Sequence, residues 1–209
     1  MEIIGANKFS NIDAYLFDLG GVIVDIDPQA AIEAFQQIGL NNLEEQITHG
    51  HHNGLFKQYE LGAISTTEFI DHIQQLLPER VDDQVIIDAW AKMLVMLPVC
   101  RVELLQKISK EKPVYLLSNT NEIHRKAYLG MAEGYDNIEL IFKKAYYSFE
   151  IKFNKPDLDC FKYVIEDAEL IPERTLFLDD SQMNLDAAQE LGFKTLLVSK
   201  EKPIESIFR

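Results

Sequence analysis

The chain has 209 residues, of which 47% are hydrophobic and 26% charged, so it can bury a sizeable core. Its 34 acidic and 20 basic residues give a formal charge of -14, which repels nucleic acids and anionic membranes and excludes them as expected partners. Two cysteines are too few for a disulfide framework. Apolar runs fall far short of the ~18 residues that span a bilayer, and the first residues lack a signal-peptide pattern. We therefore expect a cytoplasmic protein.

Five short apolar runs predict strands buried on both faces of a parallel sheet, because their apolar residues are consecutive rather than alternating. They are residues 14–17, 114–117, 145–147, 175–178 and 195–198. Helical patterns separate most of these runs, which is typical of an α/β fold. We predict a Rossmann-like parallel sheet core.

The segment between the first two predicted strands is almost entirely helical in pattern. One helix is expected to begin with Asp27 as N-cap and Pro28 in its first turn, and to end at Gly39. Another begins at a capping box formed by Ser65 and Glu68.

This helical segment predicts an inserted subdomain. We place a helical cap at residues 27–97, inserted into a core made of residues 1–26 and 98–209. Tyr59, Trp90 and the stretch from Met93 to Met96 are interpreted as core residues.

Polar side chains follow the predicted strands at the edge where α/β sheets bind ligands. In chain order they are Asp18, then Ser118, Asn119 and Thr120, then Lys155, and finally Asp179 and Asp180. Carboxylates, a hydroxyl and a lysine at one edge suit phosphoryl transfer, which needs a nucleophile, a bound cation and donors for phosphate oxygens.

Four short motifs in this order resemble those of the haloacid dehalogenase (HAD) superfamily. They are Phe17-Asp18-Leu19-Gly20-Gly21-Val22, Leu117-Ser118-Asn119, Asn154-Lys155-Pro156-Asp157 and Phe177-Leu178-Asp179-Asp180. Within the superfamily the chain is similar to glucose-1-phosphate phosphatases and to the phosphatase domain of soluble epoxide hydrolases. The resemblance implies the HAD fold with a cap after the first motif.

The resemblance also implies an aspartyl-phosphate mechanism. Asp18 would attack phosphorus, with Lys155 and Ser118 as its catalytic partners. Phosphate oxygens would be bound by Ser118, Asn119, Lys155 and Gly21.

A magnesium ion is the cofactor that the resemblance implies. Mg²⁺ would bind the Asp18 carboxylate, the Gly20 carbonyl and the Asp179-Asp180 pair, in which we expect Asp180 to be the direct ligand. The implied activity is a Mg²⁺-dependent phosphatase for a small phosphorylated metabolite, with a sugar phosphate such as glucose 1-phosphate as the expected substrate.

One position departs from the pattern of the family. Most phosphatases of the superfamily carry a second Asp two residues after the nucleophile, as the acid that protonates the leaving oxygen, but this chain has Gly20 there. A positioned acid contributes about 10²–10⁴ in rate. A sugar 1-phosphate needs that proton less, because its anomeric leaving oxygen is less basic.

Other polar residues near these motifs have simpler interpretations. We expect Asp27 to cap a helix and Asp25 to be a solvated loop acid. His49, His51 and His52 form a cluster without enough further ligands for zinc. We interpret it as an exposed loop, with a contact between the cap and the substrate as the alternative.

Two other functions stay open from the sequence. A 2-haloacid dehalogenase also lacks an acid at the Gly20 position, but its reaction needs no metal, so retention of two acids argues against it. A phosphate-binding regulatory protein with weak turnover is the other. We expect a small phosphate ester as partner, and a monomer or homodimer.

Overall fold

The computed structural model describes residues 9–41, 54–132, 134–135 and 137–208. Its sheet has five parallel strands in the order β5-β4-β1-β6-β7. They are β1 (Ala14–Phe17), β4 (Val114–Ser118), β5 (Lys144–Tyr147), β6 (Thr175–Asp179) and β7 (Lys194–Leu197). All five predicted strands are confirmed to within a residue or two at their ends.

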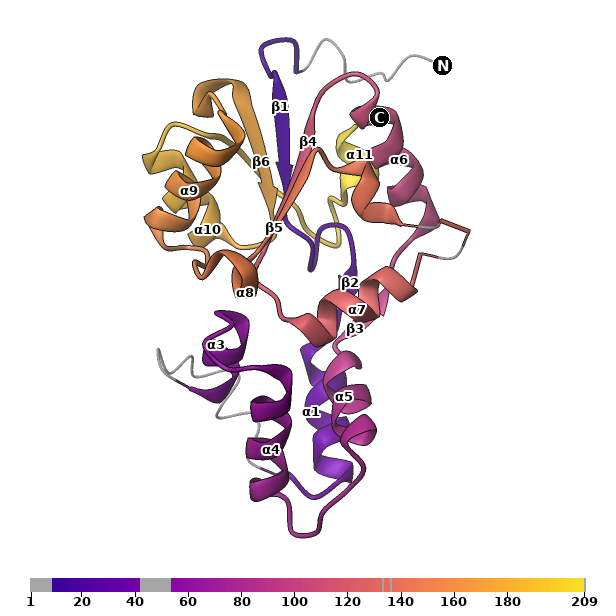
Figure 1. The fold of residues 1–209 in the computed structure, drawn as a ribbon. Coiled ribbons are helices and arrows are strands. Elements are labelled where there is room, and N and C mark those ends of the chain that lie inside the picture. Colours follow the sequence, from indigo (N-terminus) through magenta and orange to yellow (C-terminus); the bar gives the residue numbers. More distant parts are fainter. Residues whose placement is uncertain (1–8, 42–53, 133, 136, 209) are drawn as a thin grey trace.

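Helices cover both faces of this sheet (Figure 1). From residue 99 onward, the helices that the structure describes are α6 (Val99–Ser109), α7 (Glu122–Gly130), α8 (Ser148–Ile151), α9 (Leu158–Ala168), α10 (Gln182–Glu190) and α11 (Ile204–Ile207), with the 3-10 turns η1 (Ile138–Ile141) and η2 (Pro172–Arg174). Helices α6 and α11 lie on one face, and α9 and α10 lie on the other (Figure 1).

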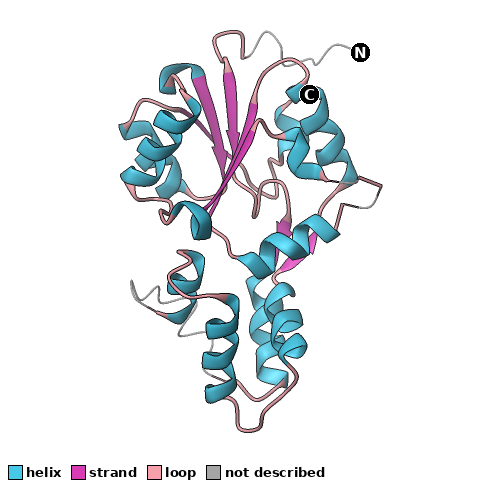
Figure 2. Cartoon of the chain, viewed as in Figure 1, coloured by secondary structure: helices cyan, strands magenta, loops and turns pink. Residues whose placement is uncertain are grey.

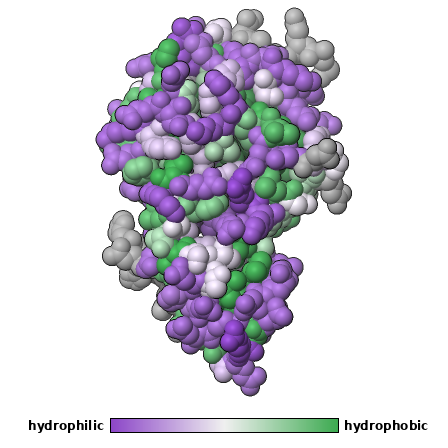
Figure 3. All heavy atoms as spheres, in the orientation of Figure 1, coloured by the Kyte–Doolittle hydropathy of each residue, from purple (hydrophilic) through white to green (hydrophobic). Residues whose placement is uncertain are grey.

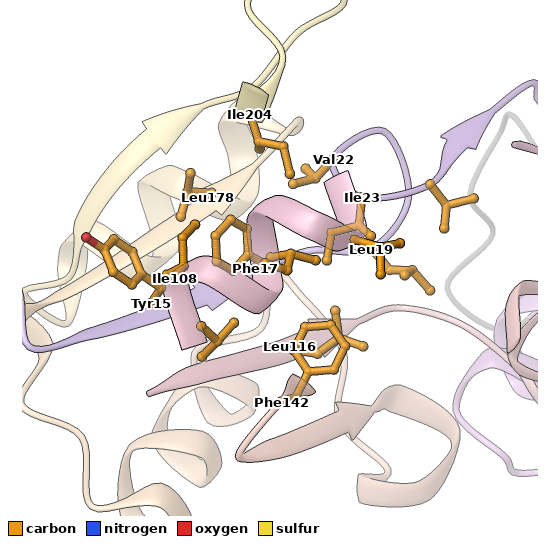
Figure 4. Close-up of a cluster of buried hydrophobic side chains, with 14 of the residues drawn as sticks. Tyr15, Phe17, Leu19, Val22, Ile23, Ile108, Leu116, Phe142, Leu178 and Ile204 are labelled. Carbon is orange, nitrogen blue, oxygen red and sulfur yellow. The ribbon is translucent and has the colours of Figure 1, made fainter. Parts of the chain in front are cut away.

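Two hydrophobic clusters explain why the strands are apolar at consecutive positions. Tyr15 and Phe17 of β1 face the cluster under α6 and α11, part of which Figure 4 shows. Leu16, between them, faces the cluster under α9 and α10. The inner strands β1, β4 and β6 are thus buried on both sides, as expected for a parallel sheet covered by helices. The edge strands β5 and β7 are only partly buried, so the prediction of burial on both faces is wrong for them.

A group of helices lies apart from the sheet, beyond its carboxyl edge (Figures 1 and 2). It consists of α1 (Pro28–Gln37), α3 (Leu55–Glu60), α4 (Thr66–Leu76) and α5 (Asp83–Ala91). These helices bury their own cluster around Trp90, whose ring centroid lies 4.8 Å from that of Phe56. Ile123 of α7 packs into the same cluster, so this helical group rests on the sheet-bearing part of the chain.

The predicted starts of two of these helices are confirmed. The Asp27 carboxylate accepts a hydrogen bond from the Gln29 backbone N–H, with Pro28 as the first residue of α1. Ser65 and Glu68 form both hydrogen bonds of the capping box at the start of α4. Local sequence sets these ends, because each needs only residues within one helical turn.

A two-stranded antiparallel ribbon at the waist was not predicted. It pairs β2 (Asp25–Ile26) with β3 (Leu94–Met96), at the two places where the chain passes between the sheet and the helical group. The prediction that the stretch up to Met96 is core is wrong in part, because Val95 and Met96 are 57% and 52% exposed. Leu94, at the start of β3, is the one buried residue of that strand.

Asp25 also differs from its prediction as a solvated acid. Its carboxylate forms a 2.7 Å ion pair with the buried guanidinium of Arg101, which also donates to the Ile23 carbonyl and to Glu205. Arg101 lies 76 residues away in sequence, so no local pattern indicated the pairing.

None of the described helices has the length and apolar character needed to cross a membrane. Hydrophilic side chains predominate on the face shown in Figure 3, in keeping with the acidic composition.

Candidate active site at the carboxyl edge of the sheet

Three of the predicted site residues lie together because three neighbouring strands end at one edge. Asp18 directly follows β1, Ser118 is the last residue of β4, and Asp179 is the last residue of β6. Strand β1 lies between β4 and β6, so Asp18 is central. All three are buried at the floor of the site.

Lys155 reaches this floor from the segment before α9. Its Nζ donates to Asp18 Oδ1 at 2.6 Å and to Asp179 Oδ2 at 2.7 Å. Burial by itself would lower the pKa of Lys155, but the charges of Asp18 and Asp179 outweigh it and raise that pKa above its usual range. Lys155 is therefore a permanent buried cation beside the predicted nucleophile.

The pKa of Asp18 is raised to about 7, mainly by burial, with Lys155 opposing and Asp179 adding to the shift. A carboxylate held this far from water is costly to keep charged without nearby cations. A divalent cation beside it would favour the charged form, which is the form that can act as a nucleophile.

The two acids at the end of β6 differ in their surroundings. Asp179 Oδ1 accepts from the Ser181 backbone N–H at 2.8 Å and from Asn184 Nδ2 at 2.9 Å, while Oδ2 binds Lys155. The pKa of Asp180 is raised by burial and by the charge of Asp179, yet the residue is exposed at the edge of the site. Its carboxylate thus remains open to an incoming ligand.

These acids fit a divalent cation. One carboxylate oxygen each from Asp18, Asp179 and Asp180 lies within 4.8 Å of the others. An all-oxygen set of this kind suits Mg²⁺, which binds a few carboxylates and completes its shell with water and phosphate.

Gly21 makes the approach of Asp180 possible. It has φ of +71°, and a Cβ atom there would lie 2.1 Å from Asp180 Oδ2. Its N–H donates to the Val24 carbonyl at 2.8 Å, so a phosphate contact from that N–H would need the turn to open. The structure thus gives Gly21 a steric part in the site.

Asn119 has a role that the sequence did not predict. Its side-chain Oδ1 accepts from the Lys155 backbone N–H at 2.9 Å, and its Nδ2 donates to the Lys155 carbonyl at 2.8 Å. This two-point contact fixes the backbone of Lys155. The Asn119 main-chain N–H stays a predicted phosphate donor.

The helical group formed by α1, α3, α4 and α5 contacts the same edge of the sheet through Ser148. Ser148 Oγ lies 2.6 Å from the Glu60 carbonyl at the end of α3, and it accepts from the Thr120 backbone N–H at 2.9 Å. Lys152 Nζ donates to the Gly62 carbonyl at 2.6 Å. The loop after α3 is thereby tied to the segment that follows Ser118.

A second set of contacts ties the cap to α7. Thr66 Oγ1 donates to Glu122, and Tyr59 OH accepts from the Ile123 backbone N–H. Tyr59 and Trp90 are buried in the cap cluster as predicted. His49, His51 and His52 lie outside the described residues.

Comparison with known proteins agrees with this geometry. Residues 12–192 match the family of haloacid dehalogenase-like hydrolases. A D-ribitol-5-phosphate phosphatase from Bacteroides thetaiotaomicron is 31% identical over 182 residues, covering 86% of this chain and 88% of its own. The chain therefore belongs to the haloacid dehalogenase-like hydrolase family.

Solved structures add two comparisons. A HAD family enzyme from Bacteroides thetaiotaomicron, in complex with magnesium and inorganic phosphate, is 40% identical, with a TM-score of 0.89 over 95% of this chain and 100% of its own. L-2-haloacid dehalogenase from Xanthobacter autotrophicus shares the fold at 16% identity, with a TM-score of 0.60 over 91% of this chain and 80% of its own. The predicted HAD fold and the predicted class of phosphoric monoester hydrolase are confirmed.

Proposed function

We propose that the protein is a Mg²⁺-dependent phosphatase that hydrolyses a small sugar or alditol phosphate through an aspartyl-phosphate on Asp18. The observation that carries the proposal is the arrangement of three carboxylates within 4.8 Å of one another, with Lys155 bound to two of them. It provides a nucleophile, a cation site and a fixed positive charge at one point.

Each polar residue of the site has a separate role in the proposed reaction. Lys155 occupies Oδ1 of Asp18, which leaves Oδ2 for attack on phosphorus. Ser118 Oγ and the Asn119 main-chain N–H donate to phosphate oxygens. Asp179 accepts three hydrogen bonds, which fix Lys155 against the nucleophile.

A bound Mg²⁺ would neutralise the charge of the phosphate and polarise a P–O bond. Its proposed direct ligands are Asp18, the Gly20 carbonyl and Asp180. In this assignment Asp179 does not bind the ion directly but holds Lys155. Two pieces of evidence support this assignment: both oxygens of Asp179 already have partners, and Asp180 lies at the open edge.

Residues 27–97 act in this proposal as a cap that closes over the phosphate. The hydrogen bonds from Ser148 and Lys152 to the loop after α3 support it, because they join the two parts at the edge that carries the site. A closed cap excludes water and limits the size of the substrate.

Two kinds of phosphate ester are candidates for the substrate: a primary ester and an anomeric ester. The similar D-ribitol-5-phosphate phosphatase acts, by its name, on a primary phosphate ester. Glucose 1-phosphate, expected from the sequence, has an anomeric leaving group. We propose the primary ester of an alditol or sugar as the preferred class, because the 31% identity extends over most of both chains.

Phosphate release from D-ribitol 5-phosphate, glucose 1-phosphate, glucose 6-phosphate and p-nitrophenyl phosphate tests the proposal. We expect turnover with Mg²⁺, none in EDTA, loss of at least about 10³-fold in Asp18→Asn, and the highest kcat/KM on ribitol 5-phosphate. Absence of turnover on every ester by folded protein with Mg²⁺ would contradict the phosphatase and favour a phosphate-binding regulatory protein. Halide release from 2-chloropropionate without metal would favour a dehalogenase.

A further inference from the structure

The proposed phosphate donors lie in residues 118–120, which we call the phosphate-binding segment. Only its first residue, Ser118, belongs to β4, and α7 does not begin until Glu122. The Thr120 backbone N–H donates to Ser148 Oγ at 2.9 Å, and the Thr120 carbonyl lies 3.0 Å from the same oxygen. Both residues are buried. The course of this segment therefore depends on a side chain 28 residues further along the chain.

The same hydroxyl also contacts the proposed cap. Helix α3 lies next to α8, whose first residue is Ser148 (Figure 1), and Ser148 Oγ is 2.6 Å from the Glu60 carbonyl in the last turn of α3. Carbonyls at a helix C-terminus have no partner within the helix. The backbone N–H groups of residues 61–63 bond to the carbonyls of residues 57–59. Ser148 therefore supplies a partner for the Glu60 carbonyl that the backbone of α3 and its loop does not provide.

Other described hydrogen bonds between the cap and the core do not reach the phosphate-binding segment. Those from Thr66 and Tyr59 end on α7. Lys152 Nζ donates to the Gly62 carbonyl at 2.6 Å, in the loop after α3. In the described part of the chain, the Ser148 hydroxyl is thus the group that bonds the cap on one side and this segment on the other.

The number of protons on Ser148 makes these contacts depend on one another. A serine hydroxyl has one proton to donate and two lone pairs. It accepts from the Thr120 N–H, so its proton goes either to the Glu60 carbonyl at 2.6 Å or to the Thr120 carbonyl at 3.0 Å. Hydrogen bonds in a chain polarise one another, so a hydroxyl that donates well is a better acceptor. Contact with the Glu60 carbonyl therefore strengthens the bond that holds the Thr120 N–H.

We propose that Ser148 is a positioning residue that couples docking of the cap to phosphate binding. With the cap docked, its hydroxyl donates to the Glu60 carbonyl and fixes the phosphate-binding segment through the Thr120 N–H. With the cap released, its proton turns to the Thr120 carbonyl. The inference rests on the proposed function, in which Ser118 Oγ and the Asn119 main-chain N–H bind phosphate.

The coupling acts in both directions, because an effect of docking on phosphate affinity requires an equal effect of phosphate on docking. A phosphate group that orders residues 118–120 therefore favours the docked cap. Inorganic phosphate carries this group without a sugar or alditol, so it is enough to favour docking when Mg²⁺ is present.

Hydrogen exchange of residues 55–63, which form α3 and its loop, measures how firmly the cap is docked. We compare exchange by mass spectrometry with Mg²⁺ alone and with Mg²⁺ plus saturating inorganic phosphate. In the wild type, phosphate should slow exchange in these residues. In Ser148→Ala, calorimetry should give a Kd for phosphate about 5-fold or more higher, and saturating phosphate should leave the exchange of residues 55–63 unchanged.

Lys152→Met is the matched control. It removes another 2.6 Å hydrogen bond to the end of α3 and its loop but does not touch the phosphate-binding segment. The cap should dock less firmly in both variants, yet phosphate should still slow exchange in Lys152→Met. Ser148→Thr retains the hydroxyl and should recover part of the protection by phosphate. Circular dichroism and thermal unfolding establish that each variant is folded.

Three results would overturn the assignment. The first is protection by phosphate in Ser148→Ala equal to that in the wild type. The second is equal loss of protection in Ser148→Ala and Lys152→Met, which indicates a role in docking alone. The third is a wild type that binds phosphate without any protection of residues 55–63. All three differ from a failure of the proposed function, in which the wild type binds no phosphate with Mg²⁺ and hydrolyses no ester.

Discussion

A single buried lysine compensates the negative charges of two buried carboxylates in the site. Lys155 lies between Asp18 and Asp179 at 2.6 and 2.7 Å, and all three are almost inaccessible to water. Removal of one partner from a buried ion pair leaves an uncompensated charge, which costs far more than loss of an exposed pair. The same residue therefore serves the stability of the floor and, in the proposed mechanism, the reactivity of Asp18.

Lys155→Met should therefore destabilise the protein as well as inactivate it. We expect a loss of about 3–5 kcal/mol in unfolding free energy, measured by urea denaturation in EDTA, and loss of phosphate release with Mg²⁺. Lys162→Met is the control, since Lys162 forms an exposed pair with Asp159, and it should change stability by less than about 1 kcal/mol. Equal stability of the two variants would contradict the conclusion that Lys155 compensates two buried carboxylates.

At the scale of elements, the loop after α3 lies against helix α8, and in the proposed function this contact holds the cap closed. Gly62 has φ of +57°, and a Cβ atom there would lie 2.2 Å from the Phe149 carbonyl oxygen. The backbone of the loop therefore lies directly on the backbone of α8. Ser148 and Lys152 of the same segment add two hydrogen bonds to this loop.

Gly62→Ala should push the loop away from α8 and displace the cap. We expect kcat/KM on ribitol 5-phosphate to fall at least about 10-fold, because small misplacements of a closing element are costly in catalysis. Gly134→Ala is a matched control: its φ is also positive, at +81°, but no atom lies within 4 Å of the added Cβ. It should share the backbone strain of the first variant and keep full activity, so similar activity losses in both would count against the docking contact.

Across the whole molecule, His124 links the cap cluster to the sheet. Its Nε2–H donates to the Trp90 carbonyl at 3.0 Å, so Nδ1 is unprotonated and accepts from Asn121. Its ring stacks on Trp90 with centroids 4.7 Å apart. Burial lowers the pKa of His124 to about 4, and the hydrogen bond to the Trp90 carbonyl opposes this shift only in part.

This lowered pKa makes stability depend on pH. Between the unfolded pKa of about 6.5 and the folded value of about 4, the unfolded chain binds a proton that the folded chain does not. The contribution is thus complete above the unfolded pKa and is lost as pH falls, at up to about 1.4 kcal/mol per pH unit. Urea unfolding from pH 7 to 4.5 should show a shallower decline in His124→Gln than in the wild type; parallel curves would contradict the assignment.

Much of the sheet and the floor of the site could be predicted from the sequence. Consecutive apolar residues identified all five strands, of which the inner three are fully buried. The polar residues at their ends identified Asp18, Ser118 and Asp179, because strand order alone brings parallel carboxyl ends to one edge. The capping box at Ser65 and the helix N-cap at Asp27 could also be predicted, because each depends only on residues within one helical turn. The division into core and cap stays a prediction, as do the cytoplasmic location and the oligomeric state.

Only the tertiary structure decided which distant groups meet. Ser148 and Glu60 are 88 residues apart, Asn119 and Lys155 are 36 apart, and Asp25 and Arg101 are 76 apart. Periodicity and capping report on neighbours within a few residues, whereas these contacts depend on how helices and strands pack. The sequence by itself therefore determined the strands and the polar residues at their carboxyl ends, and the packing of helices and strands decided which distant groups meet there.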